Sequence, residues 1–318
     1  QMPPTNFFQK GEGGEDDDPG ADFQDLESIL DECLAAGVYS SYLNWHYRSR
    51  HESLIAFSNH HYYEDKLATF PSARQGPRLG VKLNLVEGCY ERSGSRTNKV
   101  EARALVDYIF RELEDPQGKP RSIGVVTFSQ AQRDLIDDLL EEERLRHPHL
   151  ESYFSEHLQD PIFVKNLENV QGDERELILF SIGYAPDKEG RFSLNFGPLN
   201  RQGGERRLNV AITRAQEQVV VFSSIRSTQI DLSRTSAKGA AHLKYFLEYA
   251  EKGSSWVPTS GPRPTLPPWL EEIALFLEEH DYKVERLWGH SQYPIDLAVY
   301  HPQKPQEFLL AIEGDGPG

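Results

Sequence analysis

The sequence has 318 residues, 38% of them hydrophobic, and a formal net charge of -16. This length and apolar content allow two or three domains with a sizeable core. The acidic balance argues against a passive nucleic-acid coat, although a local channel for a single strand remains compatible with it. Two cysteines are too few for a disulfide framework or a Cys-rich zinc site. With no signal peptide and no apolar run of bilayer length, we expect a cytoplasmic protein without a membrane partner.

The first part of the chain combines a polar tail with two predicted helices. Residues 1–5 predict an extended tail, and the acidic, Gly-rich run that follows them is typical of a disordered loop. Apolar residues at helical spacing predict a helix over residues 23–36, with Gly37 as its stop. The segment around Tyr47 and Arg48 then leads into a second helix. Taken alone, this tyrosine could be a core aromatic and this arginine a charge at a helix start.

The middle of the chain alternates predicted strands and helices, as a layered α/β protein does. The predicted elements are strands over residues 81–86 and 123–128, and helices over residues 98–113 and from 129 to about 143. Ser129 is a suitable cap for the second helix. The hydroxyl and amide groups of Thr127, Ser129 and Gln132 are also suited to phosphate contacts that carry no sequence readout.

The stretch from residue 162 to residue 224 contains two further motifs. Its predicted elements are strands over residues 162–165, 177–182 and 219–222, and a helix over residues 206–215. Arg207 and Arg214 are seven residues apart. At about 3.6 residues per turn, both guanidinium groups would lie on nearly the same helix face. Paired arginines at the edge of a sheet are suited to holding a polyphosphate.

In this order, the motifs resemble those of the second RecA-like domain of superfamily 1 helicases, of the 1B-like type. The residues that carry the resemblance are Tyr47-Arg48-Ser49 for motif IV, residues 127–132 for motif IVa, Gln171-Gly172-Asp173-Glu174 for motif V and Asn209 to Ala215 for motif VI, with residues 1–5 similar to the end of motif III. The resemblance implies an α/β fold in which a RecA-like parallel sheet carries helices on both faces.

The resemblance also implies an ATP site that is completed by a first RecA-like domain, absent from these residues. Arg48 and Arg214 would reach the γ-phosphate as arginine fingers do, and Gln1 would sense the same phosphate. The remaining nucleotide-binding residues would be Tyr47 at the adenine, Glu174 at the ribose hydroxyls and Gly172 with its open backbone. The helix spacing adds Arg207 as the second arginine that could hold the polyphosphate. The cofactors would be ATP and Mg²⁺.

The implied partner is single-stranded nucleic acid, and the resemblance favours DNA. Its contact residues would be Thr127, Ser129, Gln132 and Gln171. The sequence has no Gly-x-x-x-x-Gly-Lys-Ser/Thr phosphate loop and no acidic Walker B strand, so we expect these 318 residues alone not to hydrolyse ATP. The predicted function is therefore the C-terminal motor-domain fragment of an ATP-dependent helicase. Two alternatives are a non-catalytic nucleic-acid-binding module and the DNA-positioning part of a nuclease.

A separate C-terminal unit follows a Pro-rich linker. Its predicted elements are a helix over residues 268–280 and strands over residues 294–300 and 307–313. If the strands are antiparallel neighbours, Asp296 meets Glu313, and together with Asp315 they offer oxygen ligands for Mg²⁺. The run resembles the start of a restriction-endonuclease-like domain related to very-short-patch-repair nucleases. The alternative is a small structural appendage.

These predictions divide the chain into four parts. They are residues 1–40 as the end of motif III and a connecting segment from the first RecA-like domain, 41–252 as the second RecA-like domain, 253–268 as the linker and 269–318 as the partial restriction-endonuclease-like domain. We expect the chain to belong to a longer protein.

Overall fold

The computed structural model describes residues 29–74, 76–115, 120–155, 157–253, 265–289 and 293–315. The predictions for Gln1, for the rest of the N-terminal tail and for most of the 253–268 linker lie outside these ranges. Within the described ranges, no helix combines the length and the apolar content that crossing a membrane requires.

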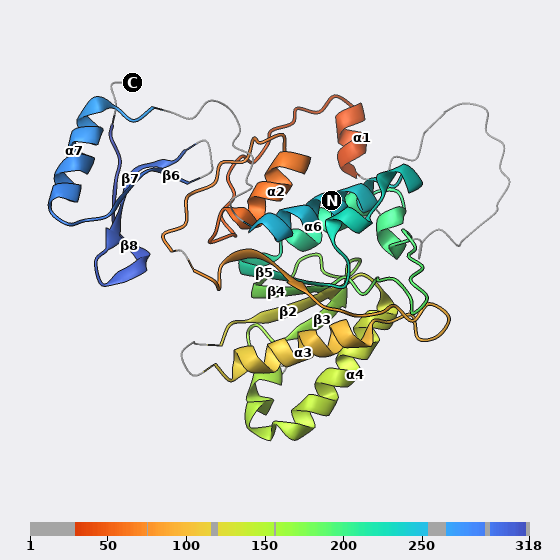
Figure 1. Cartoon of the computed structure of the whole chain (residues 1–318). Helices are drawn as coiled ribbons and strands as arrows, with labels where there is room; N and C mark the ends of the chain where they lie inside the picture. Colours follow the sequence, from red (N-terminus) through yellow and green to blue (C-terminus); the bar gives the residue numbers. More distant parts are fainter. Residues whose placement is uncertain are drawn as a thin grey trace.

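A five-stranded parallel sheet forms the centre of the larger lobe (Figure 1). Its strands are β1 (Gly80–Leu85), β2 (Ile123–Thr127), β3 (Phe163–Asn166), β4 (Arg175–Ser181) and β5 (Ala215–Ser223), in the order β1-β5-β4-β2-β3. The inner strands β2, β4 and β5 are apolar along most of their length because both faces of the sheet are covered. That pattern is why all three strands were predictable.

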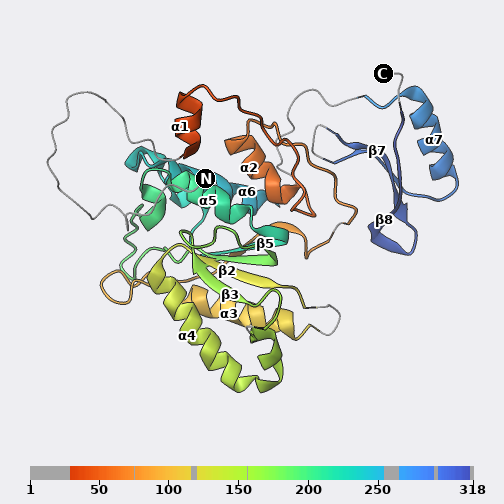
Figure 2. The same ribbon diagram turned by 180° about the vertical axis from the view of Figure 1, so that it is seen from behind.

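Helices cover both faces of the sheet, which confirms the predicted α/β fold (Figures 1 and 2). On one face lie α3 (Lys99–Leu113) and α4 (Gln130–Arg146), and on the other lie α2 (Ser53–Tyr62), α5 (Gly204–Ile212) and α6 (Lys238–Lys252). The remaining elements of this lobe are α1 (Ile29–Ala35) and 3-10 turns at Pro148–Phe154, Gly197–Asn200, Ser227–Gln229 and Leu232–Arg234.

The starts of α3 and α4 lie where the sequence predicts them. The side chain of Asn98 caps α3 by accepting a hydrogen bond from the Glu101 N–H at 3.2 Å. Ser129 caps α4 in the same way, accepting from the Gln132 N–H at 3.2 Å. Each cap satisfies a backbone donor that has no partner within the helix. Because a cap involves only neighbouring residues, it can be recognised from sequence.

The helix over the predicted motif VI ends earlier than expected. α5 ends at Ile212, and Arg214 lies in the turn between α5 and β5. The N–H of Arg175 on β4 donates to the carbonyl oxygen of Arg214 at 3.2 Å, so strand pairing begins where the helix was expected to continue. The prediction that Arg207 and Arg214 share one helix face is therefore wrong.

A smaller lobe follows at the C-terminal end (Figure 2). It contains α7 (Pro268–Glu279) and an antiparallel sheet of β6 (Val284–Trp288), β7 (Ile295–His301) and β8 (Lys304–Ile312). The expected antiparallel pairing of β7 with β8 is present, with Leu297 opposite Ile312. β6 was not predicted, because its five residues, Val-Glu-Arg-Leu-Trp, are few and neither alternate nor form an apolar run. The Trp288 indole N–H donates to the Ser72 carbonyl oxygen at 3.1 Å and so connects the two lobes.

Two glycines allow α5 and α6 to pack against the turn at Leu199. A Cβ at Gly204 or at Gly239 would stand well inside 3.0 Å of the Leu199 carbonyl oxygen, and backbone cannot move aside cheaply. We expect Gly239→Ala to lower the free energy of unfolding by about 2 kcal/mol, because it overpacks this contact. Urea denaturation measures the change. The control is Gly94→Ala, whose Cβ would find its nearest neighbour at 3.7 Å, and equal midpoints for the two variants would contradict the packing argument.

Candidate functional site

Three segments distant in sequence meet at the amino-terminal ends of β4 and β5. Arg48, in the loop before α2, donates through Nε to Glu174 Oε2 at 2.6 Å. Gln216, near the start of β5, donates through Nε2 to the other oxygen of the same carboxylate at 2.9 Å. Arg214 lies two residues earlier, in the turn after α5. The parallel sheet therefore brings the three segments predicted as motifs IV, V and VI together at the amino-terminal ends of β4 and β5.

The loop that presents Arg48 is fixed to β5 rather than left free. The Arg50 N–H donates to the Gln216 carbonyl oxygen at 2.7 Å. The Arg50 guanidinium donates to Glu217 Oε1 at 2.8 Å, on the next residue of the strand. Arg48 itself donates through Nη1 to the Thr213 carbonyl oxygen at 3.4 Å. These contacts hold the Arg48 guanidinium close to the turn that carries Arg214.

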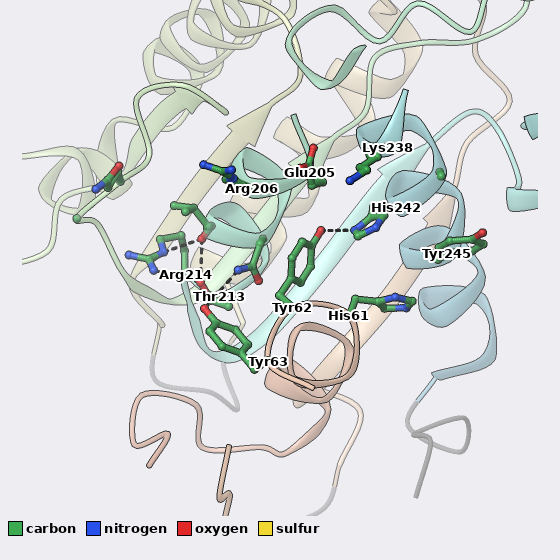
Figure 3. A pocket seen from close by; sticks show the side chains of 15 residues that line it. His61, Tyr62, Tyr63, Glu205, Arg206, Thr213, Arg214, Lys238, His242 and Tyr245 are labelled. Atoms are coloured by element: carbon green, nitrogen blue, oxygen red, sulfur yellow. Dashed lines mark hydrogen bonds between the residues drawn. The ribbon is translucent and has the colours of Figure 1, made fainter. Parts of the chain in front are cut away.

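The Arg214 side chain folds back over the end of α5 (Figure 3). Its Nε donates to the Val210 carbonyl oxygen at 2.8 Å, and its Nη2 donates to Thr213 Oγ1 at 3.1 Å. Its Nη1 reaches the Asp173 carbonyl oxygen in motif V at 3.4 Å. The C-terminal end of a helix carries partial negative charge, which favours a cation there. Arg214 is thus held at the junction of motifs V and VI.

The charges in this cluster are unbalanced. Burial lowers the pKa of Arg214, and the nearby Arg48 lowers it further. The hydrogen bond from Arg48 is the main cause that lowers the pKa of Glu174. Burial, followed by the charges of Arg48 and Arg214, lowers the pKa of His46 to about 4, so this imidazole is neutral at pH 7. Arg48 hydrogen-bonds to Glu174, whereas the hydrogen bonds of Arg214 go to carbonyl and hydroxyl oxygens. An additional anion is the kind of partner that two neighbouring guanidinium groups favour.

A cavity of about 1040 Å³ opens beside Arg214 (Figure 3). One wall comes from motifs V and VI, with Gln171, Gly172 and Arg214. The opposite wall comes from α2 and α6, where the Tyr62 hydroxyl lies 2.7 Å from His242 Nδ1. Burial and the neighbouring imidazoles lower the pKa of His61 on that wall to about 4. The space is sufficient for a nucleotide-sized ligand.

Comparison with known proteins places the chain in a family. The sequence profile of the AAA domain family matches residues 26–226. The chain belongs to the AAA domain family. It is 33% identical over 273 residues to an uncharacterized ATP-dependent helicase of Mycoplasma genitalium, an alignment that covers 79% of the chain and 22% of that protein.

Two other matched proteins are less similar in sequence to this AAA domain. A putative regulator of nonsense transcripts 1 from Takifugu rubripes is 25% identical over 212 residues, covering 62% of the chain and 18% of that protein. The solved C-terminal domain of a possible DNA helicase from a Lactobacillus has a TM-score of 0.32 and 13% identity, and covers 63% of the chain and 96% of the solved domain. The chain spans about a fifth of the length of the curated relatives it matches.

Several predicted ligand-binding residues of the AAA domain lie open to solvent. Tyr47 is 90% exposed, immediately before Arg48. Gln171 and Gly172 are exposed and line the cavity. Gly172 has a φ of 95°, a conformation that favours glycine, and no atom lies within 4 Å of the position of a Cβ. These positions leave room for a ligand, and the individual roles remain predictions.

Two predicted nucleic-acid contacts are instead part of the interior. Thr127 and Gln132 are fully buried. The Thr127 hydroxyl donates to the Ser129 carbonyl oxygen at 3.0 Å. The Gln132 amide accepts from the Asn98 N–H at 2.8 Å and donates to Ser181 Oγ at 3.0 Å. Their assignment to nucleic-acid contact is therefore corrected, because neither side chain reaches the surface. Ser129 is partly exposed, and its hydroxyl caps α4.

Arg207 also lies apart from the cluster. Its side chain is 4% exposed, and its Nε lies 3.7 Å from Glu168 Oε1 without a hydrogen bond of its own. Its Nη1 donates to the Gln202 carbonyl oxygen at 3.4 Å. The neighbouring Arg206 lines the cavity instead. Arg207 therefore forms an ion pair with Glu168 and does not line the cavity.

The predicted Mg²⁺ site in the smaller lobe does not form. Asp296 and Glu313 lie near each other, as expected: burial raises the pKa of Glu313, and the charges of Asp296 and Asp315 raise it further. However, Asp296 Oδ2 accepts a hydrogen bond from the Gly314 N–H at 2.8 Å. In the described part of the chain, no group of three or more His, Cys, Asp or Glu side chains could hold a metal ion.

Two residues of the cluster were not predicted from the sequence. Gln216 binds the Glu174 carboxylate, and His46 accepts the Ser49 N–H at 3.2 Å within the Arg48 loop. A glutamine near the start of a strand gives no functional signal by itself. His46 directly precedes the motif IV tyrosine, and that position was the available signal.

Proposed function

We propose that this AAA domain is the C-terminal motor domain of an ATP-dependent superfamily 1 helicase, in which ATP binds between it and a first RecA-like domain. The observation that carries the proposal is that Arg48, Glu174 and Arg214 lie close together at the amino-terminal ends of β4 and β5, beside an open cavity. The relatives named as ATP-dependent helicases support the same activity for the longer protein.

In this proposal, the cluster changes partners when the nucleotide binds. In the structure, Arg48 and Glu174 form an ion pair with each other. A triphosphate would compete for the Arg48 guanidinium, and the carboxylate of Glu174 would become available to ribose hydroxyls. Arg214, already held by backbone carbonyl groups, would need little rearrangement to stabilise charge on the γ-phosphate. Tyr47 would stack on the adenine, since its ring lies in the open.

The residues described here fit ATP but not the Mg²⁺ that accompanies it. Two guanidinium groups and an open glycine backbone suit a polyphosphate. No described group of carboxylates or imidazoles could hold the metal, so the first domain would supply its ligands. The metal would neutralise phosphate charge there.

Single-stranded DNA is the proposed substrate, contacted through Ser129 and Gln171. Ser129 lies at the carboxyl end of β2, and Gln171 lies in motif V beside the cavity. Both side chains offer hydrogen-bonding groups of the kind that bind a nucleic-acid backbone without reading its sequence. Gln171 would couple the strand to the nucleotide through its neighbour Gly172.

An ATPase assay on two proteins tests the proposal. We expect the longest gene product that contains this sequence to hydrolyse ATP, with turnover stimulated by single-stranded DNA. We expect the 318-residue chain alone to give no turnover above a blank, because it lacks a phosphate loop. Phosphate release measures both. Turnover by the 318 residues alone, or none by the longer product with DNA present, would contradict the proposal.

A further inference from the structure

Gln216 binds Glu174, the proposed ribose contact, from an irregular place in the sheet. Between Arg175 and Leu177 of β4, the register with β5 shifts. One residue of β4 there lies opposite two residues of β5, Gln216 and Glu217, which makes a β-bulge. The extra residue of a bulge bends the strand and re-aims its side chains, and bulges recur next to functional sites. This irregularity lies where the Gln216 side chain reaches Glu174.

Gln216 connects the Arg48 loop with the Glu174 carboxylate. Its carbonyl oxygen accepts a hydrogen bond from the Arg50 N–H at 2.7 Å. Its Nε2 donates to Glu174 Oε1 at 2.9 Å, while Arg48 Nε donates to Glu174 Oε2 at 2.6 Å. The Glu174 side chain is nevertheless 45% exposed. Two donors from different segments therefore fix a carboxylate that a ligand can still reach.

We propose that Gln216 is a positioning residue for the sugar of the nucleotide. Its amide keeps the Glu174 carboxylate in place when Arg48 turns to the phosphates, and the site thereby selects a nucleotide with free ribose hydroxyls. This inference rests on the proposed function, and it adds the sugar specificity of the proposed nucleotide site.

The two donors to Glu174 differ in how a triphosphate affects them. The Arg48 guanidinium is charged, so phosphate oxygens compete for it. The Gln216 amide is neutral and belongs to β5, so it stays with the carboxylate. Once Arg48 has turned away, Oε2 of Glu174 has lost its donor, and an ionised carboxylate can only accept hydrogen bonds. Ribose hydroxyls can replace that donor, whereas a sugar without them leaves the oxygen unpaired.

Turnover of ATP and of 2′,3′-dideoxy-ATP by the longer gene product tests the proposal. We expect Gln216→Met, which keeps the side-chain length and removes the amide, to lower kcat/KM for ATP about tenfold through KM. Turnover of the dideoxy analogue should not change, because this analogue has no hydroxyl to donate to Glu174. The control is Gln303→Met, in the exposed turn between β7 and β8, which should change neither substrate.

The results distinguish this inference from the proposed function. A loss of equal size with both nucleotides would be a purely structural effect and would overturn the inference alone. Unchanged turnover of ATP in Gln216→Met would do the same. If the unmodified longer product turned over neither nucleotide, the proposed function would fail, and the inference would fail with it.

A titration of the 318-residue chain tests the contact without any activity. The hydrogen bond from Arg48 is the main cause that lowers the pKa of Glu174, and the bond from Gln216 lowers it further. Gln216→Met should therefore raise the pKa of Glu174, because a hydrogen bond to the charged form is lost. Carboxyl carbon-13 NMR measures this pKa, and the Glu174→Gln variant assigns the signal. An unchanged pKa would mean that the amide does not hold the carboxylate, and would overturn the inference.

Discussion

Replacing Arg214 by alanine in the longer gene product is expected to lower kcat for ATP hydrolysis by about a thousandfold, as the loss of an arginine finger does. Three hydrogen bonds to the Val210, Asp173 and Thr213 groups hold the guanidinium beside the cavity. A fixed cation of this kind stabilises charge that develops in the transition state more than charge in the ground state. We therefore expect the loss to fall mainly on kcat rather than on KM.

Phosphate release at saturating ATP and DNA measures this effect. The matched control is Arg111→Ala on the exposed side of α3, which should retain full turnover. DNA binding should persist in the Arg214 variant, because the proposed DNA contacts Ser129 and Gln171 both remain and Ser129 lies at the opposite ends of the parallel strands from Arg214. Full turnover in Arg214→Ala would mean that this arginine faces no hydrolytic site. A nucleic-acid-binding module would then be the better account of the chain.

Glu101→Gln is expected to remove a pH-dependent loss of stability of about 3 kcal/mol from the AAA domain. Glu101 is fully buried on α3, and burial raises the pKa of its carboxyl from 4.5 to about 7. It accepts hydrogen bonds from Ser181 Oγ at 2.7 Å, the Gly183 N–H at 2.6 Å and Ser224 Oγ at 3.2 Å. These bonds offset only part of the cost of burying the charge.

The sign follows from which state binds the proton more tightly. The folded carboxyl has the higher pKa, so the folded state is favoured most below pH 4.5, and this advantage is lost as the pH rises from 4.5 through about 7. The difference in free energy of unfolding between wild type and Glu101→Gln should therefore change over that interval. Urea denaturation from pH 4.5 to pH 8 measures it. A constant difference would contradict the raised pKa, and Glu272→Gln, exposed on α7, is the control.

Local patterns in the sequence were sufficient to predict most of the secondary structure. The apolar runs of β2, β4 and β5 identify buried strands because both faces of the sheet are covered. The caps at Asn98 and Ser129 were recognisable because a cap joins residues only three apart. Arg48, Glu174 and Arg214 were predicted as site residues from the resemblance of the short segments that contain them, and the structure brings them close together.

The partners of those residues required the tertiary structure. Arg48 and Glu174 are 126 residues apart in sequence. The strand order that brings them together cannot be predicted from either segment alone. Pairing of β4 with β5 ends α5 before Arg214, which separates Arg214 from Arg207. Gln132 has a polar side chain of the kind that contacts ligands at a surface. In the structure it lies in the interior, where it hydrogen-bonds to Asn98 and Ser181.

By itself, then, the sequence determined the layered α/β fold, its strands and the residue types at the sheet edge, because these depend on periodicity and on neighbouring residues. Only the tertiary structure decided which charged side chains meet at the amino-terminal ends of β4 and β5. It also decided that Gln216 hydrogen-bonds to Glu174 and that Asp296 accepts a hydrogen bond from the Gly314 N–H. These are contacts between segments far apart in the chain. Their geometry depends on strand order, register and side-chain direction, which local patterns do not specify.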